Sequence, residues 1–390
     1  MNEINEYYNL LEKNNNLLEL KKYFLDIKDL FKISYDLILD NFYVVKIDSE
    51  IKRKFFIIYS VHYMIKYHKK IKYIGIDYEF DKNKIALAQF GFYEKIKDNN
   101  HKYDGIIFIT DPNEYNQKDN QIIINSIYTS NIWKILHGAD SLDIPYIYSF
   151  LKDKDNIIKF TSRMIDTRFL CEYSKIISKT ENNKCSIYGA MLYFNTITKT
   201  KYDELNELNK KMPPIYKISW KIDKISEINL KYAAYDVLFL RKFARKILKK
   251  YTKNDINFII QLTHLIYYNK HLIKINSVDF MNNYYISINN KKILLIDIFE
   301  NLKKHFEKLN NILQIQYFKS TIVNIIKNIL YYSIANKYII YGTSNIKYKI
   351  DKTNDSNILE ILKYYRISKM LKYFIKLNNY FEKNLDKLII

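Results

Sequence analysis

The segment Lys72–Phe80 (KYIGIDYEF) constrains this chain most, because apolar and small residues lead directly into two acids, Asp77 and Glu79. Residues i and i+2 of a strand point to the same face, so the two carboxylates would lie side by side at the end of a buried strand. Such a pair is costly unless a cation neutralises it, and clustered carboxylates suit Mg²⁺ or Mn²⁺. On this segment alone, an edge strand with two solvated acids is an equal alternative.

Composition limits the class of protein. The chain has 390 residues, 48% of them hydrophobic, which is enough for a substantial core. No apolar run reaches the roughly 18 residues that span a bilayer, and the polar start MNEINEYY is unlike a secretory signal. We therefore expect a soluble, intracellular protein without a membrane partner, cytoplasmic or nuclear. Cys171 and Cys185 are the only cysteines and suggest neither a disulfide framework nor a cysteine-based zinc site.

The net charge of +21 indicates a polyanionic partner such as nucleic acid. Only six of the 63 basic residues are arginine, however, and Lys, Asn, Ile and Tyr abound. An AT-rich genome produces this bias whatever the function, so the charge supports nucleic-acid binding without establishing it.

Glycine and proline locate the folded centre of the chain. All four prolines and five of the six glycines lie between residues 75 and 214, the turn chemistry of a mixed α/β fold. We predict a helical N-terminal extension (1–40), an α/β domain (41–250) and a mostly helical C-terminal domain of unknown role (251–390). The α/β domain is predicted to hold strands at 42–46, 71–80, 84–93, 105–111 and 132–136, helices at 49–68, 114–128, 144–153, 166–178, 185–194 and 226–250, and a loop at 195–224.

Further acids follow at two places. Asp140 and Asp143 lie at a strand-to-helix junction in HGADSLDIPYI, and Asp236 lies within the apolar helix LKYAAYDVLFL. Tyr232 precedes Asp236 by four residues and shares its helix face. An acid in such a helix needs a cation or a hydrogen-bond partner.

This order of acids resembles the ribonuclease D branch of the DEDD 3′→5′ exonucleases, close to the exosome-associated ribonuclease. Asp77 and Glu79 match the first motif of that family, HGA…DI the second, and Tyr232 with Asp236 the third in its tyrosine form. The resemblance covers about residues 42–250. It also extends to Gln89 in the family's L-I-Q strand, Asp166-Thr167 at its D-T, Ser186–Leu192 at its S-L-x-x-L helix, and Trp220 before the third motif.

The second motif departs from the family pattern. The family's acid stands five residues after the histidine, His137 here, and that position is Leu142. We favour Asp143, because DIPYIYSFL continues in register with the family's helix and Pro145 suits a first helical turn. Asp140 is the alternative.

The resemblance implies a ribonuclease H-like exonuclease core, a mixed β-sheet flanked by helices. It implies two divalent cations, Mg²⁺ or Mn²⁺, held by Asp77, Glu79, Asp143 and Asp236; one would activate a water and the other would stabilise the leaving 3′ oxygen. Tyr232 would orient the water, because a tyrosine hydroxyl with its ordinary pKa of about 10 is a poor base. Phe80 could stack on the terminal base, and Gln89 and His137 are candidate substrate-binding residues, although His137 also suits a packed turn. Asp166 is expected to cap a helix, and the basic run 241–250 to be a solvated helix end.

The predicted activity is removal of nucleotides from 3′ ends of single-stranded nucleic acid, RNA favoured over DNA, with release of 5′-monophosphates. One alternative is an inactive exonuclease fold that serves as a nucleic-acid-binding or assembly scaffold. Another is that residues 251–390 carry the main role through RNA or protein docking.

Overall fold

The computed structural model describes residues 2–14, 16–24, 35–81, 84–98, 101–139, 141–177, 185–213 and 218–250, together with 260, 263, 267, 285–288 and 291–294. The chain forms two compact units, Met1–Thr167 with Ser186–Lys246 and Arg168–Cys185 with Ile247–Ile390. Most of the predicted helical domain 251–390 lies outside the described residues, and its boundary and role stay predictions.

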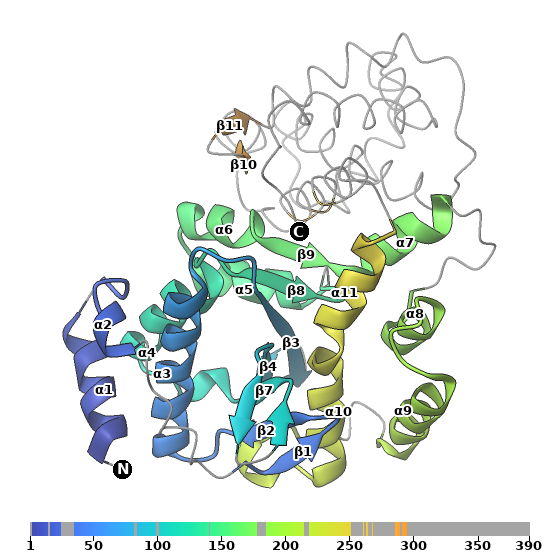
Figure 1. Ribbon diagram of the computed structural model, residues 1–390, viewed down its shortest axis with the longest axis horizontal. Helices are drawn as coiled ribbons and strands as arrows, with labels where there is room; N and C mark the ends of the chain where they lie inside the picture. Colours follow the sequence, from blue (N-terminus) through green and yellow to red (C-terminus); the bar gives the residue numbers. More distant parts are fainter. Residues whose placement is uncertain are drawn as a thin grey trace, which may run out of the picture. The chain divides into compact units, whose positions relative to one another are not determined.

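The first unit is built on a seven-stranded sheet in the order β1-β2-β7-β4-β3-β8-β9. β4 is antiparallel to β3 and β7, and β1 to β2, whereas the β2–β7, β3–β8 and β8–β9 pairs are parallel. The strands are β1 (Leu37–Leu39), β2 (Phe42–Lys46), β3 (Tyr73–Asp81), β4 (Lys84–Phe92), β7 (Gly105–Thr110), β8 (Trp133–Leu136) and β9 (Met164–Asp166). With helices flanking this sheet (Figure 1), the predicted mixed α/β fold is confirmed.

One face of the sheet is covered by α3 (Glu50–Tyr67). Ser49 caps the helix, its hydroxyl accepting a hydrogen bond from the Lys52 amide at 3.4 Å. Phe56 of α3 is fully buried, and its ring lies 5.3 Å from that of Phe90 on β4 and 5.1 Å from that of Phe108 on β7. This aromatic layer fixes α3 on the sheet.

The other face carries α10 (Glu227–Leu238), which Ser226 caps by accepting a hydrogen bond from the Asn229 amide. Gly75 and Gly91 lie opposite each other on β3 and β4, and a Cβ at Gly75 would lie only 3.2 Å from the Val237 carbonyl oxygen. Two facing glycines therefore let the helix approach the sheet backbone closely.

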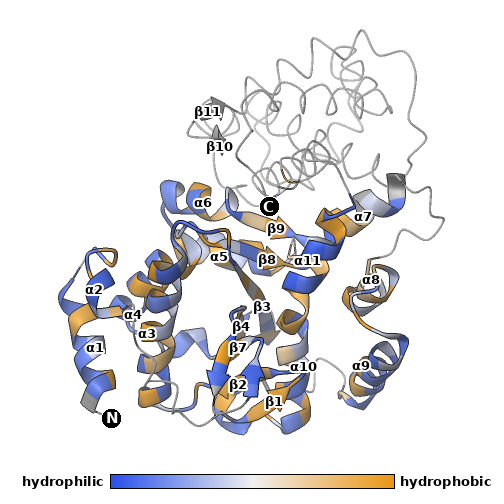
Figure 2. Ribbon diagram, viewed as in Figure 1, coloured by the Kyte–Doolittle hydropathy of each residue, from blue (hydrophilic) through white to orange (hydrophobic). Residues whose placement is uncertain are grey.

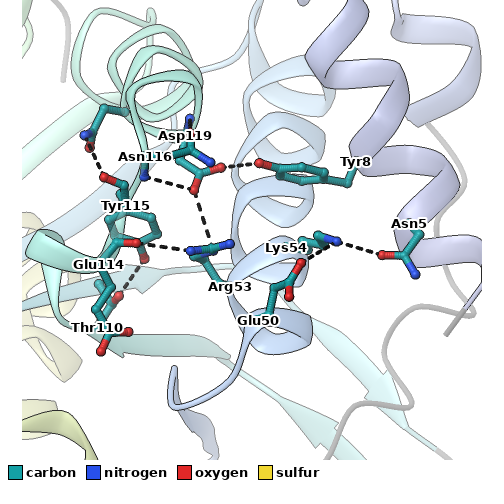
Figure 3. A network of polar contacts seen from close by, with 11 residues as sticks. Asn5, Tyr8, Glu50, Arg53, Lys54, Thr110, Glu114, Tyr115, Asn116 and Asp119 are labelled. Atoms are coloured by element: carbon teal, nitrogen blue, oxygen red, sulfur yellow. Dashed lines mark hydrogen bonds and ion pairs between the residues drawn. The ribbon is translucent and has the colours of Figure 1, made fainter.

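The N-terminal helices α1 (Asn2–Lys13) and α2 (Lys21–Phe24) pack on α3. Figure 3 shows the polar network that holds α1 in place. The buried Asp119 of α4 (Gln117–Ile123) accepts a hydrogen bond from the Tyr8 hydroxyl and pairs with the Arg53 guanidinium at 3.5 Å. One carboxylate thus joins three helices.

Several elements differ from the sequence prediction. The predicted loop 195–224 contains the helix α9 (Lys199–Lys211), which buries only Leu205 and so lacks an apolar stripe to reveal it. The predicted helix 226–250 is interrupted at Phe239, after which α11 (Leu240–Leu248) combines hydrophobic and hydrophilic residues (Figure 2). The helix expected at 114–128 is a 3₁₀ turn (Pro112–Glu114), α4, and a π-helical turn (Ile124–Tyr128).

Other helices match their predicted places within a few residues: α5 (Asp143–Leu151), α7 (Thr167–Ile177) and α8 (Ile187–Tyr193). The sequence did not predict α6 (Lys154–Thr161), β9, or the hairpin of β5 (Ile96–Asp98) and β6 (His101–Tyr103). Among the described helices, none is both long enough and apolar enough to cross a membrane.

The second unit contains a disulfide, which the two cysteines of the sequence did not suggest. A disulfide joins Cys171 to Cys185, whose Cα atoms lie 6.1 Å apart. Two cysteines alone do not reveal such a pair, because pairing depends on how closely the fold brings them together. The described part of this unit also contains an antiparallel hairpin of β10 (Tyr285–Ile288) and β11 (Lys291–Leu294), within a range predicted to be mostly helical.

Candidate metal centre

Three acids from two elements form one cluster. Asp77 and Glu79 on β3 and Asp236 on α10 each offer a carboxylate oxygen within 4.8 Å of the others. Asp236 is 7% exposed, and the two β3 acids keep part of their surface accessible. The alternation of β3 places Asp77 and Glu79 on the face that α10 covers, as the sequence predicted. We call these residues the three-acid cluster.

Burial and mutual repulsion oppose the ionised forms of these acids. Burial raises the pKa of Asp77 and of Glu79 well above their ordinary values, and the charges of Asp236 and Asp143 raise both further. Burial also raises the pKa of Asp236 to about 7, against the opposing effect of hydrogen bonds from Tyr188 and Tyr232. A divalent cation would relieve this repulsion, and an all-carboxylate donor set suits Mg²⁺ or Mn²⁺.

Asp143 lies near the three-acid cluster without belonging to it. It is the first residue of α5, where a carboxylate also interacts favourably with the helix N-terminus. Its charge raises the pKa values of Asp77 and Glu79. The alternative, Asp140, lies outside the described residues, so the choice between these two acids stays a prediction.

Asp166 fixes the turn that leads to Asp143. Its buried carboxylate accepts hydrogen bonds from the amides of Gly138 and Ala139, each at 3.0 Å. Gly138 has φ 70°, a conformation that favours glycine, and the Ala139 carbonyl accepts from the Ile144 amide at 3.0 Å. Asp166, predicted to cap a helix, directly precedes α7 (Thr167–Ile177); it also ends β9 and holds the second-motif turn.

His137 makes turn and packing contacts. Its Nδ1 lies 2.9 Å from the Thr167 hydroxyl, which donates to the Leu136 carbonyl at 3.0 Å. Since a hydroxyl has one proton to donate, Thr167 accepts from Nδ1–H. The ring also lies 6.0 Å from that of Phe243. A substrate-binding role for His137 stays a prediction.

Gln89 lies beside the acids with its amide unpaired. It is directly opposite Asp77 in the β3–β4 pair, so both side chains point to the same face. Gln89 is fully buried, yet neither its amide nitrogen nor its amide oxygen has a hydrogen-bond partner in the described part of the chain. An unpaired buried amide is unfavourable in itself, so a polar partner at this position would stabilise the protein.

Phe80 follows Glu79 at a shift in the β3–β4 register. The ring is half-buried, 6.4 Å from the ring of Tyr146 on α5 and 6.4 Å from that of Tyr78. Phe80 and Tyr146 thus present two partly exposed rings, the kind of surface on which a base can stack.

Two tyrosines contact Asp236, and the sequence predicted one of them. Tyr232 lies with its ring 6.3 Å from that of Trp220, and the charge of Asp236, followed by burial, raises its pKa well above the ordinary value. Tyr188 of α8 was missed; its hydroxyl donates to Asp236 Oδ1 at 3.0 Å. Its segment Ser186–Leu192 resembles a family helix, but nothing in that resemblance singles out the tyrosine, because the chain has 38 tyrosines and the contact spans 48 residues.

Comparison with known proteins supplies a family. No family model matches the chain. It is 34% identical over 347 residues to a protein of Acanthamoeba polyphaga mimivirus, "Uncharacterized protein L533", covering 80% of this chain and 67% of that protein. The chain belongs to the family of this mimivirus protein. The name of the mimivirus relative states no activity, so the function of the family has to be argued from the site.

A solved structure also matches. RNase D of Escherichia coli, an exoribonuclease involved in structured RNA processing, aligns over 88% of this chain and 75% of its own, with 11% identity and a TM-score of 0.39. Similarity at this level is too low to assign a function.

Proposed function

We propose that this chain is a metal-dependent 3′→5′ exonuclease that acts on single-stranded nucleic acid, RNA in preference to DNA, and releases nucleoside 5′-monophosphates. The observation that carries the proposal is the three-acid cluster of Asp77, Glu79 and Asp236, with Asp143 near enough to repel it. The order of these acids along the chain, which resembles the ribonuclease D pattern, supports the 3′→5′ direction.

The acids would hold the metal. Asp77, Glu79, Asp143 and Asp236 are the proposed ligands of two Mg²⁺ or Mn²⁺ ions. When bound, the ions supply an activated water and stabilise charge on the phosphate and the leaving 3′ oxygen. The unpaired amide of Gln89 supports this assignment, because a bound group with polar atoms would satisfy it.

The remaining residues orient the reactants. Tyr232 stays protonated because its pKa is raised, so it would orient the attacking water through a hydrogen bond rather than act as a base. Gln89 would hydrogen-bond the substrate beside Asp77. Phe80, with Tyr146 next to it, would stack on the terminal base. The net charge of +21 favours a polyanionic substrate.

The test uses a 5′-labelled single-stranded RNA and its DNA counterpart, each with Mg²⁺, Mn²⁺ or EDTA. Wild type is compared with Asp77→Asn and Asp143→Asn. We expect a ladder that shortens from the 3′ end, strongest on RNA, and lost in EDTA and in both variants. If Asp143→Asn still trims, Asp140 rather than Asp143 becomes the proposed metal ligand of the second motif. Absence of metal-dependent trimming on both substrates would contradict the proposal.

A non-catalytic scaffold is the second candidate. The close cluster among the described residues contains three acids rather than four, and the second motif carries one residue more than the family pattern. Binding of RNA or DNA without trimming, in both Mg²⁺ and Mn²⁺, would favour this candidate.

A further inference from the structure

Tyr188 contacts the three-acid cluster from an element outside the acidic motifs. It lies on α8, its side chain is 4% exposed, and its hydroxyl donates to Asp236 Oδ1 at 3.0 Å. Burial raises the pKa of the Tyr188 hydroxyl well above its ordinary value, and the nearby Asp236, Tyr232 and Asp77 raise it further. The contact therefore lies inside the site and is shielded from solvent.

The hydroxyl of Tyr188 can only donate to this carboxylate. A carboxylate has about four lone-pair positions, so Asp236 can accept from Tyr188 and still bind a cation. A hydrogen bond from a rigid, buried ring limits the rotation of the Asp236 side chain. Hydrogen-bond partners of this kind orient metal-binding carboxylates, and their loss typically weakens metal affinity about 10- to 100-fold.

We propose that Tyr188 is a positioning residue that holds the Asp236 carboxylate as a metal ligand. Tyr232 also donates to Asp236, and its oxygen keeps lone pairs that can accept a hydrogen bond from the attacking water. Tyr188 therefore acts on metal binding alone, whereas Tyr232, which hydrogen-bonds the same carboxylate, also acts on the chemical step. The inference rests on the proposed function, in that it takes Asp236 to bind metal.

The test compares Mn²⁺ binding, measured by electron paramagnetic resonance, in wild type, Tyr188→Phe and Tyr232→Phe. Phenylalanine keeps the ring and removes only the hydroxyl. Tyr63→Phe is the matched control, since the fully buried Tyr63 donates to the Tyr73 carbonyl at 2.9 Å, away from the acids. Melting in EDTA checks that each variant is folded, and trimming rates are measured at limiting and saturating Mn²⁺.

We expect Tyr188→Phe to raise the Mn²⁺ dissociation constant about 10- to 100-fold and to recover most of its trimming rate at saturating Mn²⁺. Tyr232→Phe, which also loses a hydrogen bond to Asp236, should stay slow even at saturating Mn²⁺, and Tyr63→Phe should match wild type in both Mn²⁺ affinity and trimming rate. Mn²⁺ affinity of Tyr188→Phe within about threefold of wild type would overturn the inference alone. Mn²⁺ binding by wild type without trimming would overturn the exonuclease and leave the test of Tyr188 intact. No Mn²⁺ binding by wild type would overturn both.

Discussion

The hydroxyl of Tyr93, just past the end of β4, donates a hydrogen bond to the backbone carbonyl of Val237, the residue after Asp236. Tyr93 is 1% exposed, and its hydroxyl occupies the space above Gly75 where a side chain would otherwise lie. Because Gly75 has no side chain, the Tyr93 hydroxyl fits above it and holds α10 through the Val237 carbonyl. We expect this contact to help set the distance between Asp236 and Asp77.

Gly75→Ala should destabilise the protein by about 1 to 3 kcal/mol, because the new methyl would overlap the Tyr93 hydroxyl. Tyr93→Phe should cost about 1 kcal/mol through the lost hydrogen bond. The double variant should lose less than the sum, since removing the hydroxyl also removes the closest overlap. Denaturant titration of the four proteins gives the coupling.

Gly91→Ala is the control for this cycle, because its Cβ would lie 3.3 Å from the same hydroxyl and needs only a small adjustment. Strictly additive losses for Gly75 and Tyr93 would show that the tyrosine does not set the helix position.

Gln89→Met should lower the trimming rate without lowering the stability of the protein. The substitution removes a buried amide that has no partner among the described residues, so stability in EDTA should be equal to or higher than that of wild type. Trimming should fall, because the group beside Asp77 that would bind substrate is gone. Thermal melting in EDTA and trimming rates in Mn²⁺ measure the two effects. A large loss of stability with unchanged trimming rate would show that the amide serves the fold.

Asp236 should make the stability of the metal-free protein decrease as pH rises. Its pKa is raised from 3.8 to about 7, so the folded state binds this proton more tightly than the unfolded state does. Protonated Asp236 therefore makes its full contribution to the free energy of unfolding below pH 3.8, and this contribution is lost as pH rises towards about 7. Asp236→Asn removes this dependence and keeps an acceptor for Tyr188.

The free energy of unfolding in EDTA, measured at pH 5 and pH 8, checks this. From pH 5 to pH 8, the free energy of unfolding of Asp236→Asn should rise by about 3 kcal/mol relative to that of wild type. A difference between the two proteins that does not change with pH would contradict the raised pKa.

Asp166→Asn should loosen the turn before Asp143. An Asn side chain has one acceptor oxygen, and its NH₂ group would face one of the two amides of Gly138 and Ala139 that Asp166 now accepts from. We expect a loss of about 1 to 3 kcal/mol in stability and slower trimming. Asp153→Asn is the control, since Asp153 accepts from the Asn156 amide at an exposed helix start, where Asn caps equally well. Equal effects of the two substitutions would exclude a special role for Asp166.

The sequence predicted the parts of the site that follow from local periodicity. The pairing of Asp77 with Glu79 follows from strand alternation, and that of Tyr232 with Asp236 from one helical turn. Mixed strands and helices could also be expected, because buried strands and capped helices carry their own signals.

The contacts that assemble the site could not be predicted in this way. The Tyr93–Val237 hydrogen bond joins residues 144 apart and the Tyr188–Asp236 bond joins residues 48 apart. Nothing in one sequence marks which of many tyrosines meet a distant backbone or acid. Helix α9 was missed for a related reason, since its single buried Leu205 gives no periodic pattern.

The most direct test of the proposed chemistry is the identity of the first product. A single-stranded RNA carrying one radioactive phosphate, in the linkage before its 3′-terminal nucleotide, is incubated with wild type in Mg²⁺ or Mn²⁺ and sampled before the second cleavage. Attack of water on that phosphate with departure of the 3′ oxygen predicts that the label is released as a nucleoside 5′-monophosphate, and that none is released in EDTA or by Asp77→Asn. Label that first appears in short oligonucleotides, or stays with the shortened chain, would contradict 3′→5′ exonuclease action at the three-acid cluster.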